Sequence, residues 1–230
     1  MANSINTNVG AMVALQNLNA TGRDLKVTQD RVSTGLKVGS AKDNGAIWAV
    51  SQNQKANMGV LNATRNALQR TMSVNDVGLA AGDTIMDALR QMKELAAGPS
   101  SAARDADLAA LRTEVVAAKA AAVFDGTAAL SGLTLTISAA PTAGEIDADL
   151  ASAITALQAL GTSAKSTERS LTFNDKLQDA IESGIGNLVD ADLAKESARL
   201  TALQTKQQLG VQALSIANQS GSILLGLFRN

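Results

Sequence analysis

The sequence predicts a mainly α-helical protein: a long antiparallel helical hairpin or bundle, with paired N- and C-terminal coiled-coil helices and one small β-hairpin. First, apolar residues make up 46% of the 230 positions but aromatic residues only 2%, and such aliphatic side chains suit long helices packed along their length. Second, proline, which breaks helix interiors, occurs only at Pro99 and Pro141. Third, most apolar residues recur at the three- and four-residue spacing of a helix face.

The N-terminal region is predicted to form one amphipathic helix over residues 4–34. Its apolar positions follow one another at intervals of three, four or seven residues. These positions are Ile5, Val9, Met12, Leu15, Leu18, Leu25 and Val32. The next stretch, residues 33–44 (STGLKVGSAKDN), holds two glycines and several small polar residues, so it is predicted to be a non-helical spacer. Its final Asp43-Asn44 pair is suited to capping the helix that follows.

The middle of the chain is predicted to contain two more helices and the hairpin. A long helix over residues 46–97 should end at Gly98-Pro99, and a third helix should occupy residues 104–123. The period then changes to the alternation of LTLTI at residues 133–137, which fits a short strand. Turn residues surround this strand, namely Asp125-Gly126, Pro141 and Gly144, so a β-hairpin is expected near residues 125–147.

The C-terminal part returns to a helical pattern. One helix is expected over residues 147–183, with a possible interruption near Gly161, and SGIGN at residues 183–187 should be a short break. A last helix is predicted over residues 190–228. Its apolar side chains fall on more than one side, and a helix of that kind is normally buried on several sides.

The last helix also carries two seven-residue series like the a and d positions of a coiled coil. One series contains Leu193, Leu200 and Leu214, and the other contains Leu203, Ala217 and Leu224. The N-terminal helix of the same chain is available as one partner. Other copies of the chain are needed to cover the remaining apolar surface.

Several function classes are disfavoured by composition. The chain has no Cys, His or Tyr, which removes Ser-His-Asp and Cys-His triads and the usual zinc ligands. No catalytic, cofactor-binding or metal-binding residue is therefore predicted. A net charge of −1 argues against nucleic acid as a partner. No apolar run is long enough for membrane insertion, and the N-terminus has neither the basic nor the apolar region of a cleaved signal peptide.

Two motifs identify a family. Residues 31–52 (RVSTGLKVGSAKDNGAIWAVSQ) and residues 191–228 (ADLAKESARLTALQTKQQLGVQALSIANQSGSILLGLF) resemble the N- and C-terminal signatures of bacterial flagellins. The resemblance implies an inner coiled-coil domain of residues 1–42 and 187–230. It also implies an outer helical domain of residues 43–186, containing the β-hairpin but without an additional variable domain.

The resemblance further implies a subunit that polymerises with its own copies into the extracellular filament used for swimming. Implied partners are the flagellar export apparatus, a secretion chaperone, the filament cap and the hook-junction proteins. We expect the terminal helices to fold on assembly. The residues assigned to subunit assembly are Ile5, Val9, Met12, Leu15, Leu18, Leu193, Leu200, Leu203, Leu214, Ala217, Leu224 and Phe228.

Three further sets of residues receive hypotheses. The glycines of the spacer, Gly35, Gly39 and Gly45, form either a hinge between the two domains or an ordinary loop. The polar residues of the last helix either fix the register between packed helices, or are solvated, or face the water-filled lumen of a filament. These residues are Gln204, Gln207, Gln208 and Asn218.

Residues 89–96 (LRQMKELA) resemble the segment that host immune receptors recognise in some flagellins. Glu94 and Leu95 match that segment, but Gln91 replaces its central Arg and so lacks a bidentate donor. An ordinary helix face between subunits is the favoured interpretation.

Three other functions stand as alternatives to a filament subunit. A hook–filament junction protein of the same family is the nearest alternative. A membrane-active amphipathic protein is disfavoured because the terminal helices lack a face rich in Lys and Arg. An enzyme is the most remote, given the missing His and Cys.

Overall fold

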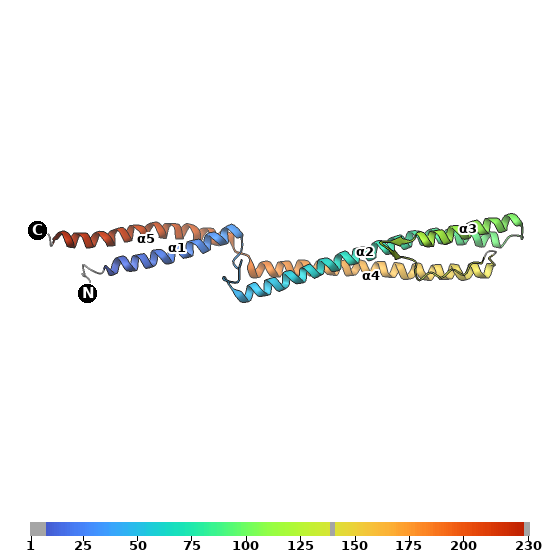
Figure 1. Cartoon of the computed structure of the whole chain (residues 1–230), viewed down its shortest axis with the longest axis horizontal. Helices are drawn as coiled ribbons and strands as arrows, with labels where there is room; N and C mark the ends of the chain where they lie inside the picture. The colour runs from blue at the N-terminus through green and yellow to red at the C-terminus, as the bar shows by residue number, and fades with distance from the viewer. Residues whose placement is uncertain (1–7, 139–140, 228–230) are drawn as a thin grey trace. The chain divides into compact units, whose positions relative to one another are not determined.

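The computed structural model describes residues 8–138 and 141–227, with side chains described up to residue 219. Within these residues the chain is mainly helical and has one two-stranded sheet, which confirms the predicted fold class (Figure 1). The elements in order are α1 (Val9–Thr34), α2 (Gly45–Ala96), α3 (Ala102–Ala121), β1 (Val123–Phe124), β2 (Thr127–Ala128), α4 (Ala143–Val189) and α5 (Leu193–Leu227). The chain forms two compact units: a terminal unit, Met1–Ala56 with Ile181–Asn230, and a central unit, Asn57–Ala180.

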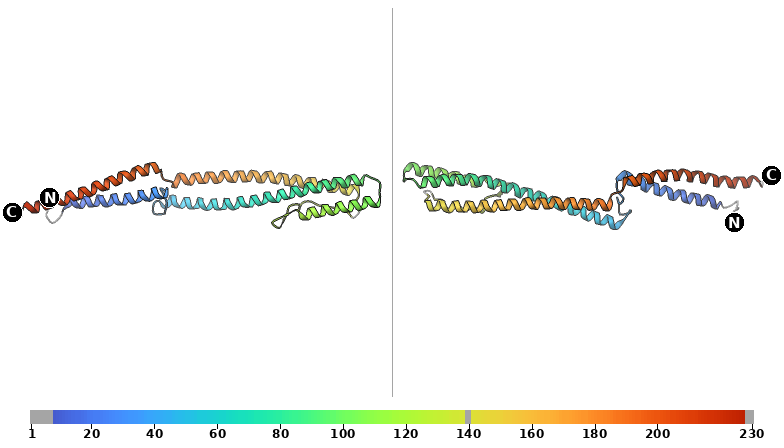
Figure 2. Two further views of the ribbon diagram at one scale, coloured as in Figure 1. Left: turned by 90° about the horizontal axis from the view of Figure 1, so that it is seen from above. Right: turned by 180° about the vertical axis from the view of Figure 1, so that it is seen from behind.

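In the terminal unit, α1 and α5 lie side by side in opposite directions, as Figures 1 and 2 show. At one end Asn8 Nδ2 donates a 2.7 Å hydrogen bond to the carbonyl of Ala217. At the other end Arg31 Nη1 lies 3.1 Å from Glu196 Oε1. The predicted pairing of the N- and C-terminal helices is therefore confirmed.

Both ends of α1 are capped by local hydrogen bonds. The side chain of Asn8 accepts from the amide of Ala11, which satisfies one of the free N–H groups of the first turn. At the C-terminus Gly35 adopts a left-handed conformation with φ of 72°, and its N–H donates to the carbonyl of Arg31. Glycine reaches this conformation without a Cβ penalty, so the helix ends at Thr34 as predicted.

The spacer, residues 35–44, is attached to the connection between α4 and α5. The amides of Lys37 and Val38 donate to the carbonyl of Val189 at 2.7 and 3.2 Å, and the amide of Ala191 donates to the carbonyl of Gly35. The spacer then ends at Asn44, whose side chain accepts from the amide of Ile47 and caps α2. The cap predicted for the Asp43-Asn44 pair is therefore supplied by Asn44.

The predicted break at residues 183–187 is wrong, because α4 continues through it to Val189. The carboxylate of Asp190 folds back over Gly186, where an added Cβ would lie 2.8 Å from Asp190 Oδ2. This glycine makes room for a neighbouring side chain and does not end the helix. The possible interruption near Gly161 is also absent, since α4 is continuous there. A helical glycine costs about 1 kcal/mol, which packing along a long helix offsets.

The central unit is built around a core of large aliphatic side chains from α2, α3, α4 and the segment before α4. Its fully buried members include Ile85, Leu89, Met92, Leu108, Val115, Leu133 and Ile146. Two glycines of α2 allow α4 to approach closely. An added Cβ would lie 2.8 Å from Leu160 Cδ1 at Gly78 and would collide with Leu157 at Gly82.

The β-hairpin lies earlier than predicted. Val123 pairs with Ala128 and Phe124 with Thr127, while Asp125 and Gly126 form the turn with φ of 51° and 75°. Two successive positive φ values are typical of a tight hairpin turn. The Asp125-Gly126 turn was thus predicted, but the hairpin is confined to residues 123–128, whereas it was expected near residues 125–147.

The predicted strand at residues 133–137 is wrong. Its alternation is real, because Leu133 and Ile137 are buried, but its backbone bonds to side chains of α4 in place of a second strand. The buried carboxylate of Asp149 accepts from the amide of Thr136 at 2.7 Å, from its hydroxyl at 2.8 Å and from the amide of Ile137 at 3.1 Å. The described residues between β2 and α4 form a turn at 129–132 and this one segment, with no further helix or strand, which agrees with the absence of a variable outer domain.

The start of α4 is a capping box. The hydroxyl of Thr142 accepts from the amide of Glu145, and Glu145 Oε2 accepts in return from the amide of Thr142 at 3.0 Å. That amide and the hydroxyl of Ser138 hold the pKa of Glu145 below its ordinary value. The helix consequently begins at Ala143, four residues before the predicted start.

Candidate assembly surfaces

The contact between α1 and α5 follows a regular coiled-coil seam. Its positions alternate in steps of three and four residues on both helices, and each of them is buried or half-buried. On α1 the seam consists of Ala11, Ala14, Leu18, Thr21, Leu25, Thr28 and Val32. On α5 it consists of Glu196, Leu200, Leu203, Gln207, Gly210, Leu214 and Ala217. Of the two predicted seven-residue series, Leu200, Leu203, Leu214 and Ala217 lie on the inner face of α5, whereas Leu193 is exposed and the side chain of Leu224 lies outside the described residues.

The seam is thin and partly polar. Thr21 and Thr28 are buried in it, and the absence of a side chain at Gly210 leaves room for Leu18, which lies 3.3 Å from where a Cβ would be. Glu196 is buried and forms an ion pair with Arg31. Among the described residues, the second carboxylate oxygen of Glu196 has no hydrogen-bond partner. A charge that is buried with a single partner favours one register of the helices over others.

The predicted assembly residues fall into two groups. The inner group lies in the seam and consists of Leu18, Leu200, Leu203, Leu214 and Ala217. The outer group is exposed and consists of Val9, Met12, Leu15 and Leu193. Ile5 and Phe228 lie outside the described residues, as does the side chain of Leu224. The structure thus separates side chains that pair α1 with α5 from side chains that remain uncovered.

Further exposed apolar side chains were not singled out as assembly residues. They are Val13 and Val27 on α1, and Leu209, Val211 and Ile216 on α5. Leu209 and Ile216 are 59% and 68% exposed and are separated by seven residues, so they lie on the same side of α5. Their spacing was the available signal, because a seven-residue repeat away from the seam marks a second apolar face. Exposed large apolar side chains gathered on one face indicate an interaction surface.

The polar residues of α5 occupy different environments. Gln207 is half-buried in the seam, whereas Gln204, Gln208 and Asn218 are exposed. A role in helix register is therefore available to Gln207. The other three lie where the hypothesis of a solvated face places them.

The three spacer glycines also differ. Gly35 alone among them has a positive φ, Gly39 donates its amide to Asp43 Oδ2 at 3.1 Å, and Gly45 is the first residue of α2. The same carboxylate accepts from the amide and hydroxyl of Ser40. The amide of Ser40 contributes most to holding the pKa of Asp43 below its ordinary value. The spacer is an ordered, hydrogen-bonded loop, and its role as a hinge stays a prediction.

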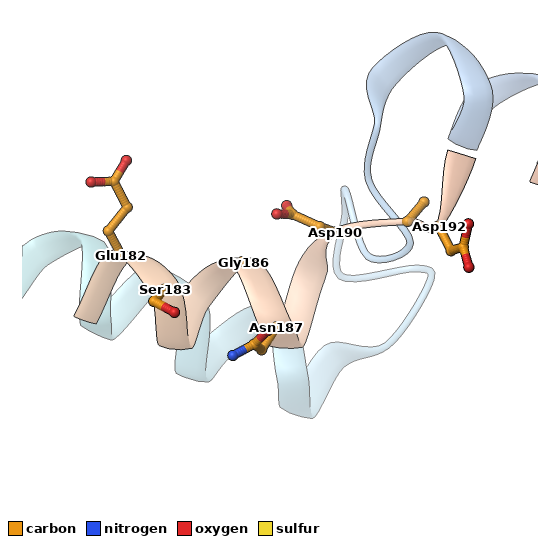
Figure 3. Close-up of a pocket in the computed structure, with 7 residues that line it drawn as sticks. Glu182, Ser183, Gly186, Asn187, Asp190 and Asp192 are labelled. Atoms are coloured by element: carbon orange, nitrogen blue, oxygen red, sulfur yellow. The ribbon is translucent and has the colours of Figure 1, made fainter. Parts of the chain in front are cut away.

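An open depression of about 470 Å³ lies beside the end of α4 (Figure 3). It is lined by Glu182, Ser183, Gly186, Asn187, Asp190, Ala191 and Asp192. The figure shows Asp190 at the end of the helix, with Glu182 two turns earlier and Asp192 past the helix end. Three of the lining residues are acidic and none is basic. The depression is therefore unsuited to binding an anion.

The segment that resembles a receptor site belongs to the central unit. Gln91 and Glu94 are exposed on α2, while Leu95 packs partly buried against the core. One of the two matching residues is thus occupied in packing the subunit itself. No helix of the described part of the chain is long and apolar enough to cross a membrane.

Comparison with known proteins agrees with this architecture. Residues 5–134 match the bacterial flagellin N-terminal helical region, and residues 144–228 match the bacterial flagellin C-terminal helical region. Flagellin FljM of Caulobacter vibrioides is 48% identical over 99% of both chains. Flagellin FljJ of the same organism is 36% identical over 100% of this chain and 99% of its own.

A flagellin of Brucella melitensis is 32% identical over 98% of this chain and 99% of its own. These matches extend over both terminal helices and the central unit. The chain therefore belongs to the bacterial flagellins: it is a structural, non-enzymatic subunit of the extracellular flagellar filament and polymerises with other flagellin subunits.

Proposed function

We propose that this flagellin assembles through the outer faces of α1 and α5, and that these two helices complete their folding when neighbouring subunits cover them. The observation that carries the proposal is the exposure of large apolar side chains on both helices, Met12 at 63% and Ile216 at 68% among them. Seven of the fourteen seam positions beneath them are Ala, Thr, Gly or Gln, and only six carry a Leu or Val. Because such a seam buries little apolar area, much of the stabilisation of the pair has to come from other subunits.

Coupling folding to assembly has a functional consequence. A chain whose terminal helices gain stability only from neighbours polymerises at a growing filament end, where these neighbours are already in place, more readily than in free solution. The inner-domain bounds of residues 1–42 and 187–230 and the outer-domain bounds of residues 43–186 are retained as part of the proposal, although the compact units of the structure divide the chain after Ala56 and after Ala180. The spacer glycines Gly35, Gly39 and Gly45 would then lie where the two domains join.

The partners other than flagellin itself form part of the same proposal. Export through the flagellar export apparatus, with a secretion chaperone covering the apolar helices, suits a chain whose terminal helices are incompletely stabilised alone. Contacts with the filament cap and with the hook-junction proteins would use the same outer faces of α1 and α5, because these faces carry the exposed apolar side chains. The lumen would be lined by polar residues such as Gln204, Gln208 and Asn218.

Electron microscopy of the purified chain with short filament seeds tests the proposal. The full chain should elongate the seeds into long tubes. A Leu209→Glu/Ile216→Glu variant should keep the circular dichroism of the free chain but fail to elongate, because both side chains are exposed before assembly. Gln212→Glu, also on the exposed side of α5, is the matched control and should elongate normally. Equal elongation by all three chains would contradict the proposal.

A further inference from the structure

The pairing of α2 with α4 in the central unit leaves two different flanks beside its seam. The helices run in opposite directions and are joined by side-chain hydrogen bonds (Figures 1 and 2). Asn174 Nδ2 donates to the carbonyl of Leu61 at 3.2 Å, and Asn75 Nδ2 donates to Ser163 Oγ at 3.3 Å. The seam positions again alternate in steps of three and four residues, so each helix presents one flank on either side of the seam.

One flank of this pair contains no ionisable residue, and we call it the uncharged face. On α2 it consists of Val60, Thr64, Ala67 and Thr71, and on α4 of Ser166, Ser170, Phe173, Leu177 and Ala180. Every one of these residues is exposed. Phe173 and Val60 are 68% and 65% exposed, although these are the side chains that water solvates least well.

The two helices contribute to this face from the same side. Asn62 and Asp175 lie two positions after Val60 and Phe173 and therefore flank the seam on its other side. There Gln178 Nε2 donates to Asn62 Oδ1 at 3.0 Å, and Arg65 Nε lies 3.4 Å from Asp175 Oδ1. These contacts place Asn62 and Asp175 together on one flank, which leaves Val60 and Phe173 together on the opposite flank.

That opposite flank has a different chemistry. On α4 it carries Lys165, Glu168, Asp175 and Asp179, and on α2 it carries Asn62, Asn66 and Gln69. Charged and amide groups of this kind keep their hydration shells at low cost. In this part of α4 the charged side chains beside the seam thus all lie on one flank, although both flanks are exposed in the single subunit.

We propose that the uncharged face docks against a second copy of this chain within the filament, with Phe173 as the central anchor. This inference rests on the proposed function, because polymerisation supplies the second copy. The cores of protein interfaces are depleted in charge and enriched in aromatic residues, and the chain has only three Phe, one Trp and no Tyr. The Ala, Ser and Thr residues around Phe173 allow another helix to approach closely.

The dimensions of the face suit a lateral contact. Fifteen helical residues span about 22 Å, and the face is two helices wide, which gives an exposed patch of a few hundred Å². That area is about half of what one partner buries in a stable interface of standard size. It would therefore add to the contacts of α1 and α5 in the polymer without making the free central unit dimerise.

The natural absence of cysteine gives a direct test, since any introduced thiol is unique. The maleimide labelling rate is measured for Phe173→Cys, for Ala67→Cys on the same face, and for Thr172→Cys, whose exposed side chain lies on the charged flank. Labelling is compared between the free chain and filaments grown from wild-type seeds. On the uncharged face the rate should fall about tenfold or more in filaments, while Thr172→Cys should change far less.

The outcomes separate this inference from the proposed function. Filaments that label equally fast at Phe173→Cys and Ala67→Cys, in filament and free chain alike, would overturn the inference and leave the proposed function intact. A folded Phe173→Cys chain that no longer elongates seeds, while Thr172→Cys does, would support it, and Ala67→Cys would then report the protection. Failure of the wild-type chain to elongate seeds would overturn both.

Discussion

The central and terminal units are both helical, yet they bury very different side chains. The central core encloses Ile85, Leu89, Met92 and Leu108 with almost no exposure, whereas the buried positions of the seam of α1 and α5 are Thr21, Thr28, Glu196 and a single leucine, Leu203. Complete burial of a large aliphatic side chain contributes about 1.5–3 kcal/mol, and a buried threonine contributes less. The central unit thus buries its large apolar side chains within one chain, while α1 and α5 leave several exposed, which supports the proposal that other subunits cover them.

Truncating one core leucine in each unit gives the largest expected contrast. Leu89→Ala should lower the free energy of unfolding of the central unit by about 2–5 kcal/mol, because the cavity lies in a closed core. Leu203→Ala in the seam should lower the free energy of unfolding of the terminal unit by far less in the free chain. Urea denaturation followed by circular dichroism measures both variants. Equal losses would mean that α1 and α5 are already stably folded in the free subunit, and the contrast between the units would fail.

The carboxylate of Asp149 gives the next largest effect and concerns the central unit alone. Asp149→Ala leaves the part-buried amide of Thr136 and the buried amide of Ile137 without their acceptor, which should cost about 1–3 kcal/mol for the unsatisfied groups. Hydrogen exchange at these two amides should accelerate accordingly. The matched control is Asp147→Ala, which removes an exposed ion pair with Lys93 and should cost at most about 1 kcal/mol. Unchanged exchange at residues 136 and 137 would refute the assigned role.

Asp149 also illustrates what the sequence could not reveal. The alternation of LTLTI correctly predicted that one side of residues 133–137 is buried. It could not predict whether the backbone would bond to a strand or to a carboxylate on a helix, because the partner of Thr136 lies thirteen residues away. The helices themselves were predictable, since their hydrophobic period persists over many turns and proline is absent from their interiors.

The assembly surfaces were predictable only in part. The seam of α5 was visible in its leucines, but the seam of α1 includes Thr21 and Thr28, which give no apolar signal, so inner and outer residues of that helix could not be told apart. The helix break predicted around Gly186 was wrong because the sequence does not show what surrounds a glycine. A glycine that makes room for a neighbouring side chain has the same sequence signature as one that ends a helix, and only the contact with Asp190 distinguishes them.

Removing the ion pair of Arg31 and Glu196 should have a smaller effect, and this effect concerns the terminal unit. Arg31→Met leaves the buried carboxylate without its cation, at a cost that we expect to appear on assembly, when α1 and α5 are fixed together. The critical concentration for elongation should rise about tenfold, which corresponds to about 1.4 kcal/mol. Arg31→Met/Glu196→Leu should recover most of this loss, since two apolar side chains fill the same site. A double variant as poor as the single one would contradict an electrostatic origin.

The smallest expected effect is the pH response of the spacer in the terminal unit. Hydrogen bonds from Ser40 to the carboxylate lower the pKa of Asp43 in the folded chain below the ordinary value of 3.8. The charged form therefore stabilises the folded loop above pH 3.8, and this contribution is lost as the pH falls through the lower, folded pKa. A carbon-13 titration of the carboxyl group by NMR measures the shift. Ser40→Ala removes the hydroxyl donor but keeps the amide, so it should raise the pKa only part of the way to 3.8.

The capping box of the central unit supplies the comparison for that titration. There the pKa of Glu145 is lowered by the amide of Thr142 and the hydroxyl of Ser138, so Ser138→Ala should raise it in the same direction. In both loops a carboxylate accepts hydrogen bonds from a backbone amide and a hydroxyl, once in the terminal unit and once in the central unit. If the terminal unit is held less firmly in the free chain, the shift at Asp43 should grow on polymerisation while the shift at Glu145 stays constant. Equal shifts in free and assembled chains would show that the spacer is already as firmly held as the central unit, and would confine the dependence on neighbours to α1 and α5.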